Sequence, residues 1–429
     1  MKIALVNSYD IIGGAARAAY RIHQALLRHG VDSTMHVNQA EVDDWTVQGP
    51  IGNWHKTRHR VRLNLGRNAK RPLKTGNPVI HSPALMPSLW PMRLNALAAD
   101  IVHLHWINDE MFSIADIGRI RKPIVWTLHD MWAFCGAEHY TEEFRWREGY
   151  QRDNRPDYES GFDLNHWVWR RKRKKWRQPM QIVTPSRWLA ECVRESALMR
   201  DWPVTVVPYA LDTDVWRPID KQQARELFGL PLDTPILLFG AIGGSRDPRK
   251  GFDLLQSALQ HLNGEIPSLH LVVCGQSAPE EPPDFGFPVH YTGRLHDDFS
   301  LRVLYSAADA LVIPSRQDNL PNTGVESLAC GTPVVAFDTC GLPDIVQHQK
   351  TGYLARAFDT EELAKGIRWL LADRARHTEL SANARHNAVT RFAFPAVAAR
   401  YMEVYRTVLS QKPPYKTFPP SAASCQRSI

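Results

Sequence analysis

Short apolar runs alternate with amphipathic segments along most of this chain. In the first half the runs end in polar residues, as in KIALVNS, ADIVHLHW, PIVWTLHD and MQIVTPS. Between the first two, ARAAYRIHQALLRHG carries apolar residues at helical spacing and has a glycine at its end. Such runs are typical of buried parallel strands, and the amphipathic segments are typical of the helices that cover them.

The same alternation begins again in the second half of the chain. Strands are predicted at TPILLFGAIG, SLHLVVCG, PVHYTGR, ADALVIPS and TPVVAFD, with helices at KGFDLLQSALQHL, SLRVLYSAAD and TGVESLACG. The pattern therefore predicts an α/β fold of two doubly wound units, one after the other. In such sheets ligands bind at the carboxyl ends of the strands, which is where the polar residues lie.

Turn residues and composition divide the chain further. Prolines and turn formers in VVPYALDTDVWRP place the join between the two units near residues 206–218. We expect an N-terminal domain, a polar and aromatic insertion within it, a C-terminal domain, a helix that packs back on the N-terminal domain, and a disordered proline- and serine-rich tail. Their predicted ranges are 1–205, 140–177, 206–392, 393–411 and 412–429, respectively.

Composition excludes several classes of protein. A chain of 429 residues, 44% apolar and 23% charged, fits two folded domains. No window reaches the roughly 18 apolar residues of a membrane span, and MKIALVNSYD lacks the features of a signal peptide. The six cysteines are scattered without a C-x-x-C pair, which fits reduced thiols better than disulfides or a zinc site. We therefore expect a cytoplasmic protein.

The net charge of +7 is concentrated in two basic runs, at residues 55–76 and 167–177. Three interpretations remain open: a solvated face, an anionic membrane surface, or a nucleic acid. Tryptophans flank the second run, WVWRRKRKKWR, and favour the membrane surface slightly. A nucleic-acid-binding protein is disfavoured because neither run belongs to a recognisable reading element.

The first candidate for chemistry is DIIGGAARAAYR at residues 10–21. Gly13 and Gly14 lie between a strand and a helix, where glycine lets backbone N–H groups approach a phosphate and the helix start carries partial positive charge. Arg17 follows as a further substrate-binding candidate. The motif is not G-x-G-x-x-G, which argues against a dehydrogenase. A simple tight turn is the alternative.

The second candidate is GAIGGSRDPRKGFDLL, where another strand ends in glycines. Arg246, Arg249 and Lys250 gather there before a helix. Cations held on a short backbone segment can neutralise a pyrophosphate leaving group as its charge develops. A basic surface turn is the alternative, but it does not explain why glycines and cations coincide at a strand end.

The third candidate is the strand end TLHD. His129 and Asp130 would point into the mouth of a cleft, where the histidine could bond a sugar hydroxyl or assist proton movement. A structural His–Asp pair is the competing interpretation.

The fourth candidate, DNLPNTGVESLACGTPVV, combines carboxylates with a helix start. Asn322 or Thr323 is a natural cap, and the free N–H groups there can hold an anion. Asp318 lies in the loop before the helix. Glu326 lies about one turn inside it and could accept bonds from vicinal hydroxyls such as those of a ribose. The segment thus predicts a site for a sugar, a diphosphate and a nucleoside.

Together, these motifs in this order resemble retaining glycosyltransferases of family 4, which have the GT-B fold of two Rossmann-like domains facing a central cleft. The likeness extends over about residues 1–410 and is strongest at 236–356. The block DNLPNTGVESLACGTPVVAFDTCGLPDIV resembles bacterial members that build exopolysaccharide, capsule or lipopolysaccharide. The resemblance implies transfer of a hexose from a nucleotide-diphosphate sugar to a saccharide acceptor that is lipid-linked, without cofactor or metal.

By position, the resemblance implies roles for the candidate residues. Glu326 would hold the ribose, Asp318 would contact the donor sugar, the backbone of Leu320–Thr323 would bind the diphosphate, and His129 would face the transferred sugar. The family usually has Glu where this chain has Asp318.

The remaining implied roles concern the phosphates. Lys250, with Arg249 or Arg246, would stabilise the departing diphosphate, while Gly13 and Gly14 would close over it from the other domain.

Three alternatives stay open: a nucleotide-sugar epimerase of the same two-domain form, a basic nucleic-acid-binding protein, and an inactive scaffold of the same fold. The expected partners are a nucleotide sugar and a saccharide, with no nucleic acid, and the expected location is the cytoplasm, peripherally at the inner face of the membrane.

Overall fold

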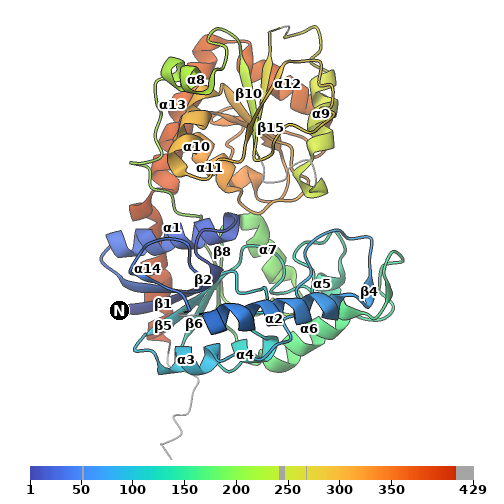
Figure 1. The fold of residues 1–429 in the computed structure, drawn as a ribbon, viewed down its shortest axis with the longest axis vertical. Coiled ribbons are helices and arrows are strands. Elements are labelled where there is room, and N and C mark those ends of the chain that lie inside the picture. Colours follow the sequence, from blue (N-terminus) through green and yellow to red (C-terminus); the bar gives the residue numbers. More distant parts are fainter. Residues whose placement is uncertain (51–52, 241–246, 267, 412–429) are drawn as a thin grey trace, which may run out of the picture.

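The structure is a computed structural model that describes residues 1–50, 53–240, 247–266 and 268–411 (Figure 1). Two α/β domains lie one above the other, and the C-terminal helix α14 belongs spatially with the N-terminal domain. Among the described helices, none combines the length and apolarity needed to cross a bilayer.

The N-terminal domain is built on a seven-stranded sheet whose neighbouring strands all pair in parallel. Its strand order is β3-β2-β1-β5-β6-β8-β9. These strands are β1 (Lys2–Tyr9), β2 (Asp32–Gln39), β3 (Val47–Gln48), β5 (Ile101–Leu104), β6 (Ile124–Thr127), β8 (Gln181–Thr184) and β9 (Val204–Val206). The helices are α1 (Gly14–Arg28), α2 (Asn53–Lys70), α3 (Trp90–Ala96), α4 (Ile114–Ile117), α5 (Arg145–Glu148), α6 (Leu164–Lys175) and α7 (Arg187–Glu195). A small antiparallel pair joins β4 (Leu73–Lys74) to β7 (Ser160–Gly161).

The C-terminal domain has a six-stranded parallel sheet in the order β12-β11-β10-β13-β14-β15. The strands are β10 (Ile236–Gly240), β11 (His270–Cys274), β12 (Val289–Gly293), β13 (Ala310–Ile313), β14 (Val334–Phe337) and β15 (Gly352–Ala355). The helices are α8 (Lys221–Phe228), η1 (Pro248–Lys250), α9 (Phe252–Gln260), α10 (Asp298–Ala307), α11 (Asn322–Ala329), η2 (Leu342–Asp344), α12 (Thr360–Leu371) and α13 (Arg374–Arg391). The predicted class, two doubly wound α/β domains, is confirmed, because in both sheets the strand order reverses beside the first strand.

The chain passes between the domains twice, and the two passages pair with each other. The N–H of Leu211 donates to the carbonyl of Phe392 at 2.7 Å, and Phe394 returns a bond to Leu211 at 3.2 Å. Helix α14 (Phe394–Ser410) then runs along the N-terminal domain, where it packs on α1. Its Tyr405 hydroxyl lies 2.7 Å from the Nδ1 of His103 in β5. The predicted tail at 412–429 lies outside the described residues.

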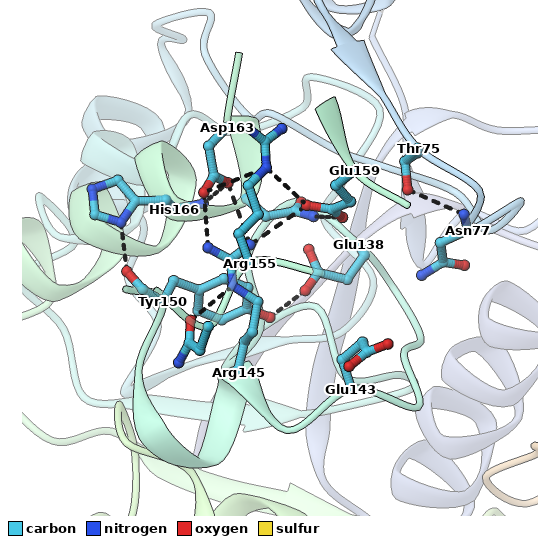
Figure 2. Close-up of polar contacts among 12 residues, drawn as sticks. Thr75, Asn77, Glu138, Glu143, Arg145, Tyr150, Arg155, Glu159, Asp163 and His166 are labelled. Atoms are coloured by element: carbon cyan, nitrogen blue, oxygen red, sulfur yellow. Dashed lines mark hydrogen bonds and ion pairs between the residues drawn. The ribbon is translucent and has the colours of Figure 1, made fainter. Parts of the chain in front are cut away.

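The polar insertion is held by a buried ionic network, which Figure 2 shows. Arg145 reaches Asp163 at 2.8 Å and Glu159 at 3.5 Å, and its guanidinium lies over the ring of Tyr150. The Tyr150 hydroxyl donates to Glu138. These contacts hold the insertion together and tie it to Glu138, which directly precedes His139 and Tyr140 in the chain.

The second basic run, residues 167–177, is more buried than its sequence suggested. Trp169 and Trp176 are core residues of α6 and its end, and Lys172 is fully buried, where its ammonium donates to the carbonyl oxygens of Cys135 and Gly136. Trp169 and Trp176 thus belong to the hydrophobic core that the insertion shares with the rest of the N-terminal domain. The expectation that the tryptophans of this run flank a membrane-facing surface is therefore wrong for Trp169 and Trp176.

Candidate functional site

A cavity of about 510 Å³ lies between the two domains. Its N-terminal wall follows the carboxyl ends of β1, β5 and β6 and the start of α1, and its C-terminal wall follows β10, β11 and the start of α11. Most of the sequence-predicted site residues line it: Gly13, Gly14, Arg17, His129, Arg249, Lys250, Asp318, Leu320, Asn322, Thr323 and Glu326. Arg246 lies outside the described residues.

Lys250 and Asp318 form an ion pair at this cavity, with Nζ 2.6 Å from Oδ2. The hydroxyl of Ser315 lies 3.3 Å from the same oxygen. Gly251 allows the approach: its φ is +64°, and a Cβ there would stand 1.9 Å from the carbonyl oxygen of Pro314. Only glycine thus brings Lys250 against the loop that follows β13.

Arg249 turns toward the rim of the cavity. Its guanidinium bonds Asp247 at 2.6 Å and lies 4.4 Å from the ring centre of Tyr140 in the other domain. Burial lowers the pKa of Arg249, but Tyr140 and Asp247 outweigh that effect and raise it overall. The guanidinium therefore stays charged and joins the two domains at this edge.

The helix starts of α1 and α11 face each other across the cavity. Helix α11 begins at Asn322 after Pro321, and no side chain caps it. The expectation that Asn322 or Thr323 is the cap is wrong, because the Asn322 amide reaches across and donates to the carbonyl of Gly14 at 2.9 Å. Gly13, with a φ of +89°, makes the turn into α1. Two positively polarised helix ends therefore meet at one place.

Glu326 is buried and bonded at both oxygens. Oε1 accepts from Arg21 of α1 at 2.6 Å, and Oε2 accepts from the Tyr305 hydroxyl at 2.9 Å. Arg21 also lies 3.6 Å from Asp298. Burial lowers the pKa of Arg21, but Glu326 and Asp298 more than compensate and raise it. Glu326 is therefore paired with a buried cation that comes from the other domain.

Arg21 and Tyr305 are functional candidates that the sequence analysis missed. Arg21 lies one turn after Arg17 on the same face of α1, and Arg17 is likewise tied to the C-terminal domain, with Asp298 at 3.3 Å and the carbonyl of His296 at 2.9 Å. A charged residue within the apolar stripe of an amphipathic helix was the available signal.

His129 lies in the wall of the cavity, but its ring is engaged by the protein. Nδ1 is 2.8 Å from the Tyr209 hydroxyl, and Nε2 is 3.1 Å from Nδ1 of His105. Burial lowers the pKa of His129 to about 4, partly offset by Asp130, so the ring is neutral at pH 7. To bond a sugar hydroxyl, His129 would have to exchange one of these partners.

The carboxylate of Asp130 forms its hydrogen bonds with residues other than His129. It accepts from Nδ1 of His139 at 2.6 Å and from the indole N–H of Trp106 at 3.1 Å. Burial raises the pKa of Asp130, but His139 and the hydrogen bonds lower it overall. Asp130 is therefore an ionised carboxylate bonded to the rings of His139 and Trp106. The sequence did not indicate that these two residues would be its partners.

Within the described ranges, no group of three or more histidine, cysteine, aspartate or glutamate side chains is placed to hold a metal ion. The cysteines at 135, 192, 274, 330 and 340 are free thiols.

Comparisons with known proteins show that both the N-terminal and the C-terminal half of the chain are similar to glycosyltransferases. The family model "Glycosyltransferase Family 4" matches residues 12–215, and "Glycosyl transferases group 1" matches residues 220–387. D-inositol 3-phosphate glycosyltransferase of Xylanimonas cellulosilytica is 33% identical over 256 residues, 54% of this chain and 60% of that protein. The protein of the same name from Thermobispora bispora is 34% identical over 236 residues, 52% of this chain and 54% of that protein. The chain thus spans little more than half the length of these relatives.

Solved structures show the same fold over nearly the whole chain. Sucrose-phosphate synthase from Thermosynechococcus elongatus has a TM-score of 0.65 at 18% identity, covering 96% of this chain and 100% of that one. WaaG, a glycosyltransferase involved in lipopolysaccharide biosynthesis, has a TM-score of 0.62 at 19% identity, and the match covers 94% of this chain and 99% of that one. Anabaena HepE in complex with UDP-glucose has a TM-score of 0.61 at 15% identity, and the match covers 95% of this chain and 100% of that one.

Proposed function

We propose that this chain, which belongs to glycosyltransferase family 4 and has the GT-B fold, transfers a hexose from a nucleotide-diphosphate sugar to a saccharide acceptor with retention at the anomeric carbon. One observation carries the proposal: the Lys250–Asp318 pair, Glu326 and two uncapped helix starts all face a single cavity between the domains. A cation, polarised N–H groups and carboxylates together match a diphosphate flanked by hydroxyl-rich groups.

Each part of the donor has a complementary group. Glu326 accepts bonds from the ribose hydroxyls, since its oxygens each have room for a further acceptor bond beside Arg21 and Tyr305. The start of α11 receives the diphosphate. Asp318 contacts the donor hexose. Anabaena HepE, of the same fold, is described with UDP-glucose, which supports a nucleotide sugar as donor.

The reaction follows from these positions. The anomeric C–O bond breaks and its electron pair goes to the diphosphate, where Lys250 and the helix start stabilise the developing charge. The acceptor oxygen bonds the anomeric carbon on the same face, and its proton passes to a leaving phosphate oxygen. Asp318 is held by Lys250 and Ser315, so it serves in binding rather than as a covalent nucleophile. Contact between the domains excludes water and suppresses hydrolysis.

The acceptor in this proposal is a lipid-linked glycan of bacterial cell-surface polysaccharide, reached from the cytoplasmic side. The outward face of α2 supports this, because Arg58, Arg60 and Arg67 are exposed there together with Val61 and Leu65. Cations beside aliphatic side chains suit an anionic membrane surface, and each cation there contributes about 1 kcal/mol. We expect the triple Arg→Gln variant of α2 to lose binding to phosphatidylglycerol vesicles; equal binding would refute this contact.

The test of the catalytic proposal is a thermal-shift panel of UDP-, GDP-, ADP- and dTDP-sugars, followed by product analysis with the sugar that binds. A ligand bound to the native state raises the melting temperature by mass action. We expect one nucleotide class to stabilise the protein and nucleotide diphosphate to be released when acceptor is present. Accumulation of a free epimer without any acceptor would instead identify an epimerase, and no shift with any sugar would overturn the proposal.

A further inference from the structure

The part of the cavity opposite the diphosphate site is an aromatic wall. Tyr9 ends β1, Trp106 follows β5, and Asp130 follows β6, and these strands are neighbours in the sheet. Their carboxyl ends therefore bring the three side chains to one edge. All three line the cavity, as does His139 beside them. None of these four residues is needed to hold the nucleotide.

Trp106 is locked in place before any ligand binds. Its indole N–H donates to Asp130 at 3.1 Å, and its backbone N–H donates to Asn7 at 2.7 Å. The indole stacks on Tyr9 with ring centres 6.2 Å apart and lies 5.7 Å from the ring of His139. The residue is nonetheless only half-buried. A fixed and partly open aromatic face binds a flat apolar surface with little loss of conformational entropy.

Most of the cations that line the cavity come from the C-terminal domain. Among the described residues of the N-terminal domain that line it, Arg17 is the only arginine or lysine, and it is bound to Asp298 at the donor end. Arg249, Lys250 and Arg294 line the cavity from the C-terminal domain. Arg67 of α2 acts on Tyr9 electrostatically but does not line the cavity. Arg249 does lie against Tyr140 of the N-terminal domain, but it is paired with Asp247. Among the described lining residues, the aromatic wall therefore supplies no unpaired cation for a second phosphate.

The wall does offer acceptors for hydroxyl groups. Oδ2 of Asp130 takes bonds from both His139 and Trp106, whereas Oδ1 takes one from the N–H of Trp132 at 2.9 Å. A carboxylate oxygen accepts about two bonds, so Oδ1 keeps one position for a donor. An ionised carboxylate beside an aromatic face suits a neutral polyhydroxylated ring, and it repels an anion.

We propose that the sugar which accepts the hexose is an uncharged pyranose whose C–H face stacks on Trp106 and one of whose hydroxyls donates to Asp130. This rests on the proposed glycosyl transfer and narrows its acceptor, because it excludes a phosphorylated sugar or polyol at this wall. The C–H face of a pyranose gains by leaving water for an aromatic surface, and the hydroxyl replaces its lost water with the carboxylate.

The experiment compares acceptors and variants with the nucleotide sugar found in the binding panel. The neutral probes are p-nitrophenyl α- and β-hexopyranosides, and the phosphorylated probe is inositol 3-phosphate. We expect transfer to at least one neutral glycoside and none to inositol 3-phosphate. Trp106→Ala should raise the acceptor KM about tenfold or more, with the donor KM unchanged. Trp106→Phe, which keeps a ring, should lie between Trp106→Ala and wild type.

A matched control separates stacking from general damage to the fold. Trp90 is also half-buried in the N-terminal domain and stacks on Phe112, but it does not line this cavity. Trp90→Ala should leave the acceptor KM at the wild-type value, and nucleotide-diphosphate thermal shifts should persist in all three variants.

The outcomes distinguish the two proposals. If no nucleotide sugar binds, the proposed function fails and this inference fails with it. If a nucleotide sugar binds, the inference alone is overturned by transfer to inositol 3-phosphate, by absence of transfer to every neutral glycoside, or by a wild-type acceptor KM in Trp106→Ala.

Discussion

Replacing Lys250 by methionine tests the role of the ion pair at the centre of the cavity. Methionine keeps most of the aliphatic stem and removes only the ammonium group, which lies 2.6 Å from Asp318. The side chains are 25% and 11% exposed, so the pair is partly solvated. The substitution should therefore affect catalysis much more than folding.

The two magnitudes follow from the geometry. A partly solvated ion pair contributes about 1 kcal/mol or less to stability, so the melting temperature should fall by only a few degrees. A charge about 4 Å from a developing unit charge interacts by about 4 kcal/mol at an effective dielectric of 20. The ground-state diphosphate is already anionic, so only the increase in charge at the transition state counts. Loss of one such preorganised group lowers kcat about 100- to 1000-fold.

The assay measures initial rates of nucleotide-diphosphate release together with calorimetric melting. Lys221→Met is the matched control, because Lys221 pairs with Asp309 at 2.8 Å in the same domain but does not line the cavity. It should lose similar stability and keep its kcat. A kcat for Lys250→Met within about fivefold of wild type, equal to about 1 kcal/mol, would refute leaving-group stabilisation by this residue. So would a rate loss that Lys221→Met shares.

Three further predictions concern buried ionisable side chains. Glu326→Gln removes the closer of the two carboxylates at buried Arg21 and leaves only Asp298 at 3.6 Å, so the free energy of unfolding should fall by about 2 kcal/mol and calorimetric affinity for nucleotide diphosphate should drop; unchanged values in both would contradict the role of Glu326. Arg145→Met removes the nearer cation from Asp163 and leaves Arg155 at 4.0 Å, so the free energy of unfolding in urea should fall by about 3 kcal/mol, with earlier proteolysis in residues 140–177; wild-type resistance to urea and protease would contradict the ionic anchor. The pKa of His129 lies near 4 in the native state, below its ordinary 6.5, so only the unfolded state takes up its proton between those values. Stability should therefore fall on acidification from about pH 6.5 to 4, and His129→Gln should reduce that slope by about 1.4 kcal/mol per pH unit; an unchanged slope would contradict the neutral buried ring.

Local sequence determined the strands, the polar residues at their ends and the glycines that allow tight turns. The strand that precedes His129 and the loop carrying Asp318 were predictable because a buried parallel strand is a short apolar run, and its end is marked by the first polar residues. Gly13 and Gly14 were predictable for the same kind of reason, since a strand-to-helix turn needs them within a few residues. Parallel sheets then place such ends on one edge.

Only the tertiary structure decided which groups meet across the domains. Arg21 and Glu326 are 305 residues apart, and the Asn322 amide reaches Gly14 over 308 residues. Hydrophobic periodicity tells which face of α1 is buried, but not that Asp298 of α10 and Glu326 of α11 pair with Arg21 on that helix. The same limit applies to Trp169, whose neighbouring cations suggested a surface although it packs in the core. Hydrophobic periodicity indicates which residues of one helix or strand are buried. A site between domains depends instead on how the two folded domains dock, which is determined by the shape and charge of residues that are distant in sequence.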